Sequence, residues 1–214
     1  MLADNSPYYE SGVKLTHISE NGIWLFGGLA LNGWQRIQRV SGNSLMSWGT
    51  QIQVRPSENV LLNYSTFLGT DKPDSARLWR YFHNLYGIFQ VNDRFGLTFG
   101  FDIGHEQVAK GSDKMNTWFT PIAIIRYMLN DNWAITARVE YYQDENGVII
   151  TTGTPNGFKN FGASLNVDRT IGKNFWWRSE IRAFKSKDAI FTRDGNLVNN
   201  NAAFTTSIAL TFNN

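Results

Sequence analysis

The stretch FGLTFGFDIGHE, Phe95 to Glu106, has a large apolar residue at each odd position through Ile103 and a small or polar residue at each even position. This period of two predicts a β-strand whose two faces meet different surroundings. In a water-soluble barrel the apolar face fills the core and the polar face meets solvent. In an outer-membrane barrel the apolar face meets lipid and the polar face lines the lumen. This strand alone is compatible with both arrangements.

Composition restricts both the fold class and the possible functions of the chain. Charged residues make up 18% of the 214-residue chain, below the roughly 25% usual for soluble domains, while aromatic residues reach 14%. A net charge of +2, without a run of Lys or Arg, argues against nucleic-acid binding. The absence of Cys excludes disulfides, thiolate metal sites and Cys catalysis. No linker-like stretch divides the chain, so we expect one domain over residues 1–214.

Turn signals divide the chain into about eleven strands and no membrane-spanning helix. The connections between them alternate between short and long. In an up-and-down meander this places all the short turns at one end, which is typical of bacterial outer-membrane barrels. The expected strands are Tyr8 to Ile18, Ile23 to Trp34, Met46 to Arg55, Val60 to Thr70, Trp79 to Val91, Phe95 to Glu106, Thr117 to Leu129, Trp133 to Gln143, Phe158 to Asp168, Phe175 to Lys185 and Ala203 to Phe212.

The predicted fold class is therefore an all-β, antiparallel, up-and-down transmembrane β-barrel. A soluble or periplasmic lipocalin-like barrel that encloses an apolar ligand is the alternative. The chain ends on the short-turn side, but its first strand begins on the long-loop side. Because bacterial barrels have an even number of strands, this parity predicts the C-terminal part of a longer barrel, without its signal peptide and with at least one N-terminal strand missing.

Charged residues of both signs fall on the polar faces of the predicted strands. We expect them to line a water-filled lumen, where facing clusters of opposite sign create a transverse field. The alternative is that they pair with one another and stiffen the wall. The predicted pore-lining residues are Arg55, Asp102, Glu106, Arg126, Arg138, Glu140, Asp168, Arg178, Glu180 and Arg182.

Most tryptophans lie near the ends of predicted strands, where membrane barrels carry girdles of aromatic side chains at the lipid headgroups. In a small soluble barrel the same residues would plug the open ends. The predicted girdle comprises Trp24, Trp34, Trp79, Trp118, Trp133, Trp177 and Phe212. The last strand, FTTSIALTFNN, is similar to the C-terminal signature that the outer-membrane assembly machinery reads, although Asn213 and Asn214 follow its final Phe212.

Two long loops carry further signals. The loop DENGVIITTGTPNG includes Val148, Ile149 and Ile150, which are too apolar to stay in water. It is expected either to fold inward as a constriction or to extend the barrel wall. In the last loop, Asp194-Gly195 predicts a two-residue hairpin turn.

The sequence gives little support for a catalytic site. His17, His83 and His105 are separated by whole hairpins and have no metal-ligand spacing. No nucleophile is placed beside a base, since Asp102 and His105 fall on opposite faces of one strand. We expect no enzymatic activity, no metal and no cofactor.

Several stretches resemble one family. SPYYESGVKLT, LNGWQRIQRV, DKPDSARLWRYFHNLYGIFQ, FGLTFGFDIG and ENGVIITTGTPNGF are similar to the OmpL-like type of beta-barrel porin, common in the outer membranes of Bacteroidetes. The resemblance covers nearly the whole chain and implies an outer-membrane pore, without a catalytic motif and without a defined substrate. Together with the strand pattern, it leads us to expect a passive diffusion pore for small hydrophilic solutes or ions, in contact with outer-membrane lipids. Family members are longer, with additional N-terminal strands. A structural or adhesive barrel with a plugged lumen is the remaining alternative.

Overall fold

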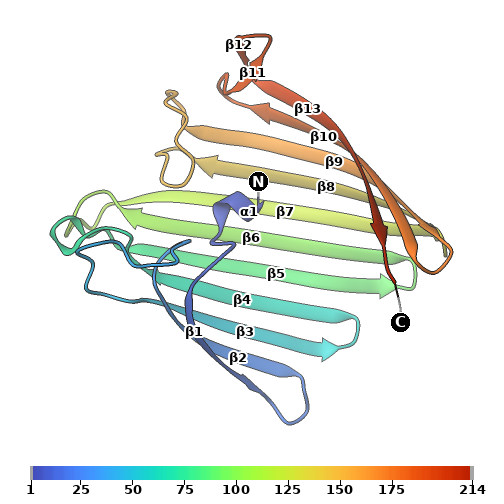
Figure 1. Ribbon diagram of the computed structural model, residues 1–214, viewed down its shortest axis with the longest axis horizontal. Coiled ribbons are helices and arrows are strands. Elements are labelled where there is room, and N and C mark those ends of the chain that lie inside the picture. The colour runs from blue at the N-terminus through green and yellow to red at the C-terminus, as the bar shows by residue number, and fades with distance from the viewer. Residues whose placement is uncertain (1, 213–214) are drawn as a thin grey trace.

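Eleven strands form one antiparallel sheet in which almost every strand pairs with its neighbours in the chain (Figure 1). The computed structural model describes residues 2–212. The sheet order is β1 to β10 followed by β13, while β11 and β12 form a separate hairpin. The predicted all-β, up-and-down antiparallel fold class is confirmed. The elements are α1 Leu2–Asn5, β1 Gly12–Ile18, β2 Trp24–Leu31, β3 Ser47–Ser57, β4 Val60–Gly69, the 3-10 turn Asp74–Ala76, β5 Arg80–Asn92, β6 Phe95–Gln107, β7 Met115–Asn130, β8 Trp133–Asp144, β9 Phe158–Ile171, β10 Phe175–Ser186, β11 Phe191–Arg193, β12 Asn196–Val198 and β13 Asn200–Leu210.

The connections are sorted by length between the two ends of the sheet. The short turns, residues 19–23, 58–59, 93–94, 131–132 and 172–174, lie at one end, and the long loops, residues 32–46, 70–79, 108–114, 145–157 and 187–199, lie at the other. The β11–β12 hairpin turns through Asp194 and Gly195, with φ angles of 50° and 79°. Positive φ at both central residues matches a type I′ turn and confirms the prediction for this loop.

The two faces of the sheet differ in the way that separates a membrane barrel from a soluble one. On β6, Phe99 and Phe101 are exposed, whereas Asp102 and Glu106 are buried. Leaving a Phe side chain in water, rather than in an apolar medium, costs about 1.5 to 3 kcal/mol of transfer free energy. The outward face therefore suits hydrocarbon. Its exposed apolar side chains include Trp24, Phe26, Trp48, Ile52, Leu62, Leu85, Phe99, Phe101, Ile125, Val139, Phe161, Leu165, Ile181, Phe204 and Ile208.

The opposite face of the sheet is concave, as contacts between side chains of distant strands show. Trp34, in the loop after β2, lies 5.9 Å from Trp118 on β7, measured between ring centroids. Four strands, β3 to β6, separate these two positions within the sheet. The remaining members of this aromatic cluster are Leu31, Phe67, Phe82, Tyr142 and Phe158.

The curved wall has two edge strands, β1 and β13. Each pairs on one side only within residues 2–212, and every side chain of both strands is exposed. In the same part of the chain, no helix is long and apolar enough to cross a membrane.

Candidate pore lining

The predicted pore-lining residues of β6 to β10 all fall on the concave face. They occupy the even positions of these strands, the same set that carries the buried Asp102, Glu140 and Ser164. Register places them in rows across the wall, such as Arg126 beside Thr136 and Asn166 beside Glu180. Arg55 differs, since it is exposed beside a register shift at the short-turn end of β3.

Glu140 is the centre of a charged cluster on β8 and β10. Its carboxylate accepts a hydrogen bond from Nη2 of Arg138 at 2.6 Å and another from Nη2 of Arg182. Gly162 of β9 stands in register between Glu140 and Phe184, so no side chain blocks the reach of Arg182 across β9. The Glu140 side chain is 1% exposed, whereas those of Arg138 and Arg182 are 26% and 25% exposed.

A second ion pair lies nearer the short turns. Arg178 donates from Nε and Nη2 to the two carboxylate oxygens of Asp168, at 2.6 and 2.8 Å. The Arg178 side chain is 59% exposed and that of Asp168 only 18%. Both residues line a hollow of about 310 Å³ that also includes Arg126 and Trp176. In both clusters the cationic group is the more exposed partner.

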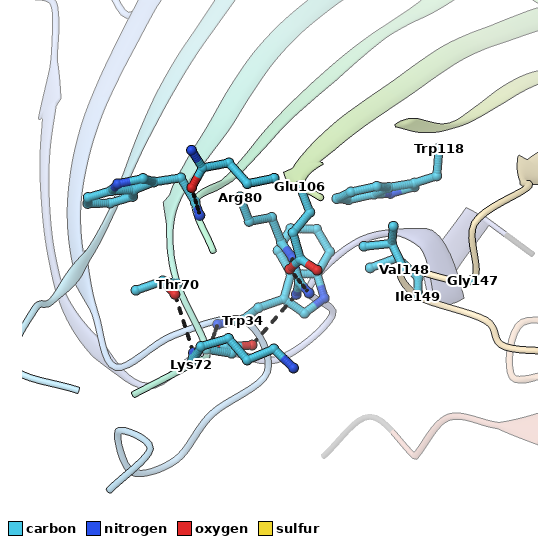
Figure 2. A network of polar contacts seen from close by, with 12 residues as sticks. Trp34, Thr70, Lys72, Arg80, Glu106, Trp118, Gly147, Val148 and Ile149 are labelled. Carbon is cyan, nitrogen blue, oxygen red and sulfur yellow. Dashed lines mark hydrogen bonds and ion pairs between the residues drawn. The ribbon is translucent and has the colours of Figure 1, made fainter. Parts of the chain in front are cut away.

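A third ion pair, between Arg80 and Glu106, lies at the long-loop end of the sheet. Arg80 points to the concave face and donates from Nε and Nη2 to Oε2 of Glu106, at 2.9 and 2.6 Å (Figure 2). Its Nη1 lies 3.6 Å from Asp71. The guanidinium also stacks 5.2 Å from the ring centroid of Trp34 and 5.9 Å from that of Trp118. In the sheet, Arg80 is directly paired with Glu106, a register that the sequence does not reveal.

The girdle prediction is wrong for Trp34 and Trp118, which lie in the aromatic cluster on the concave face with 6% and 0% exposure. Trp34 follows the end of β2 in a loop that folds inward, where its backbone N–H donates to Asp71 Oδ1 at 3.0 Å. Trp118 occupies an inward position of β7, and its Nε1–H donates to the backbone oxygen of Asn5 at 3.2 Å. Proximity to a strand end therefore does not identify which way a tryptophan faces.

The other predicted girdle residues lie outside the aromatic cluster. Trp24 is exposed and stacks on Phe26, and Trp133 meets Trp177 edge to face on the outward side. Trp79 precedes β5 in the loop of residues 70–79, and Phe212 follows the end of β13.

The loop of residues 145–157 folds inward rather than extending the wall. The fully buried carboxylate of Asp144 accepts the backbone N–H groups of Val148, Ile149 and Ile150 at 2.9, 2.7 and 2.9 Å. These three side chains pack against the aromatic cluster, and Figure 2 shows Val148 and Ile149 beside Trp118. One carboxylate thus holds the turn that carries apolar side chains over the concave face.

An amide ladder, formed by Lys14, Gln51, Asn63, Asn84 and Asp102, crosses the other half of the concave face. Lys14 Nζ donates to Gln51 Oε1 at 2.7 Å, and Gln51 Nε2 donates to Asn63 Oδ1 at 2.9 Å. Asn63 Nδ2 donates to Asn84 Oδ1 at 3.2 Å, and Asn84 Nδ2 donates to Asp102 Oδ1 at 2.5 Å. Gly27 on β2 leaves room for Lys14 to reach Gln51. The concave face is thus divided into an amide half on β1 to β6 and an arginine half on β7 to β10.

A family model described as "Putative beta-barrel porin-2, OmpL-like" matches residues 1–212. The chain belongs to this porin family. A search of curated proteins found no significant match. Among solved structures, the KdgM porin in complex with disordered oligogalacturonate is similar at 11% identity and a TM-score of 0.43, over 96% of this chain and 95% of that chain. That likeness adds no weight to the assignment, which the family match carries alone.

As a member of this family, the protein is a β-barrel porin of the bacterial outer membrane that lets solutes diffuse passively. Membership points to a transport channel rather than to an enzyme. The outward apolar face and the concave polar face agree with hydrocarbon outside and water within.

Carboxylates in the porin's loops tie neighbouring loops together. Asp74 accepts from Arg77 Nη2 at 2.6 Å and from the Ser44 backbone N–H at 3.2 Å, and these bonds lower its pKa from 3.8 to about 2. Because the pKa is lowered, the link is fully present above the ordinary value and is lost as the pH falls through about 2. Burial raises the pKa of Asp71, against the opposing effect of Arg80. The Asn156 backbone N–H and side chain lower the pKa of Asp188, joining two further loops.

Proposed function

We propose that the porin passes small hydrophilic solutes with a preference for anions. The observation that supports this preference is the unequal exposure of the paired charges on the arginine half. Arg138, Arg178 and Arg182 present partly exposed guanidinium groups, while Glu140 and Asp168 lie beneath them. A passing ion therefore meets the cationic side of each pair first. Because the lumen wall has a low dielectric constant, that asymmetry raises the local concentration of anions.

The preference is tested by the reversal potential of the porin in planar bilayers under a KCl gradient. We expect the anion-to-cation permeability ratio to fall in the variant Arg178→Gln, because this removes the most exposed guanidinium among Arg138, Arg178 and Arg182. Lys185→Gln is the matched control: it removes one cation from the same strand at an outward position. An equal fall in both variants, or a wild-type porin that prefers cations, would contradict the proposal.

We also propose that the opposing charges in the lumen act chiefly by pairing, with the net field set by the exposed arginines. The ion pairs Arg138–Glu140, Arg178–Asp168 and Arg80–Glu106 support this interpretation over that of separate clusters of opposite sign. Trp24, Trp133 and Trp177 are proposed to remain in the girdles, and the same role is proposed for Trp79 and Phe212 at the strand ends.

Further strands are proposed to complete the wall between β13 and β1. The support is the odd number of strands in the described sheet and the two edges that pair on one side only. The outward row of Phe204, Ile208 and Leu210 on β13 supports recognition of this strand by the outer-membrane assembly machinery. The porin itself is proposed to carry out no chemistry.

A further inference from the structure

The amide ladder has a direction that its two ends determine. Lys14 can only donate hydrogen bonds, and the two carboxylate oxygens of Asp102 accept from Asn84 and Asn5. With a donor at one end and an acceptor at the other, each amide between them must turn its oxygen toward Lys14 and its nitrogen toward Asp102. The three amide dipoles therefore point the same way, which strengthens each bond of the chain.

The ladder also fixes which hydrogen-bonding groups remain for a solute. Each side-chain amide has two N–H donors and an oxygen with two acceptor sites. Gln51 and Asn84 each use one N–H and one acceptor site within the ladder. Gln51 and Asn84 therefore each keep one N–H donor and one acceptor site for a solute. Neither side-chain amide can flip without breaking hydrogen bonds of the ladder. Asn63 is buried and spends its second N–H on Ser65 Oγ at 3.0 Å.

A cavity of about 290 Å³ lies over this part of the wall, near the lower limit of volumes that hold small molecules. Gln51, Asn84 and Ser65 contribute polar groups to its lining, while Phe67 and Phe82 contribute apolar rings. Ser6, Pro7 and Glu10 line it from the N-terminal side. Donors and acceptors alternate beside apolar rings, an arrangement that matches a molecule with hydroxyl groups on an apolar carbon frame, since each hydroxyl both donates and accepts.

Charge in the cavity favours a neutral ligand over an ion. Lys14 is already bonded to Gln51, and its charge acts on Glu10 across the same cavity. The opposite charges compensate each other, so a free anion or cation gains little by entering. From this geometry we propose that the amide ladder forms a subsite for a neutral polyhydroxylated solute of the size of a monosaccharide. The subsite deepens the proposed function, because it adds a solute class to a pore whose ion preference is set on the opposite half.

The test is the blockade of single-channel ion current by glucose in planar bilayers. We expect wild-type porin to show a saturable blockade and Gln51→Met to weaken it about 3- to 10-fold, the effect of losing neutral hydrogen bonds. Gln53→Met is the matched control, because Gln53 lies two residues along β3 on the same face but outside the ladder. Lys14→Met, at an exposed position, removes the donor at the end of the same ladder and is expected to weaken the blockade as well.

Each outcome has a separate meaning. Wild-type porin that conducts ions but shows no glucose blockade would overturn the subsite and leave the pore intact. The same holds if Gln51→Met and Gln53→Met weaken the blockade equally, or if serine, a zwitterion, blocks the current and glucose does not. Absence of any conductance in wild-type protein would instead count against the proposed function.

Discussion

Replacing Glu140 with Gln is expected to destabilise the porin by about 3 kcal/mol, because removal of one partner from a buried ionic cluster leaves the other charges uncompensated. Here a single carboxylate serves both Arg138 and Arg182, and it is nearly inaccessible to water. The measurement is urea unfolding of the porin in lipid vesicles, followed by tryptophan fluorescence. Glu180→Gln removes the same charge from a less buried position on β10 and is expected to cost less than about 1 kcal/mol.

The same cluster offers a rescue experiment. Buried ionic groups can often be replaced together by apolar residues of similar size at little cost. The triple variant Arg138→Met, Glu140→Met, Arg182→Met is therefore expected to recover most of the stability that Glu140→Gln loses. If Glu140→Gln and Glu180→Gln unfold at the same urea concentration, the cluster does not stabilise the wall as described.

Replacing Asp144 with Ala is expected to free the inward loop and increase single-channel conductance. Three backbone N–H groups lose their acceptor at once, and each bond to an ionised group contributes about 1.5 to 3 kcal/mol. A local loss of about 3 kcal/mol speeds hydrogen exchange of the Val148 to Ile150 amides by roughly 100-fold. Conductance and exchange together separate opening of this loop from global unfolding.

Glu145→Ala is the control for that variant. Glu145 is the next residue, and its carboxylate forms a more exposed ion pair with Lys159 at 3.0 Å. Surface pairs of this kind contribute at most about 1 kcal/mol, so conductance and exchange should stay near the wild-type values. Unchanged conductance in Asp144→Ala would mean that the loop does not narrow the lumen.

The alternation in the sequence predicted the strands and the two faces well, because a period of two is a local property of the chain. It identified Asp102, Glu140 and Arg182 as inward residues for the same reason. Which inward residues touch depends on register between strands. The register is a property of the folded sheet, so the amide ladder from Lys14 to Asp102 could not be read from residues that lie far apart in the chain.

The inward orientations of Trp34 and of the loop after Asp144 could not be predicted from the sequence, for different physical reasons. Trp34 leaves the strand pattern at Gly33, whose φ of 142° favours glycine, and the following loop turns the indole inward. The apolar run Val148 to Ile150 predicted that this loop packs against other apolar side chains, but not in which direction. The direction was decided by Asp144, whose buried carboxylate caps the turn. An Asp followed four to six residues later by an apolar run is too common a pattern to predict this by itself.

Single cysteines provide the most direct test of which face meets lipid, and the chain contains no native Cys to interfere. Phe99→Cys and Thr98→Cys place neighbouring thiols on opposite faces of β6. In vesicles, the thiol at position 98 is expected to react with a membrane-impermeant, water-soluble thiol reagent, and the thiol at position 99 is expected to be protected. Reaction at position 99 with protection at position 98 would show that water covers the aromatic face, and the protein would not be a pore.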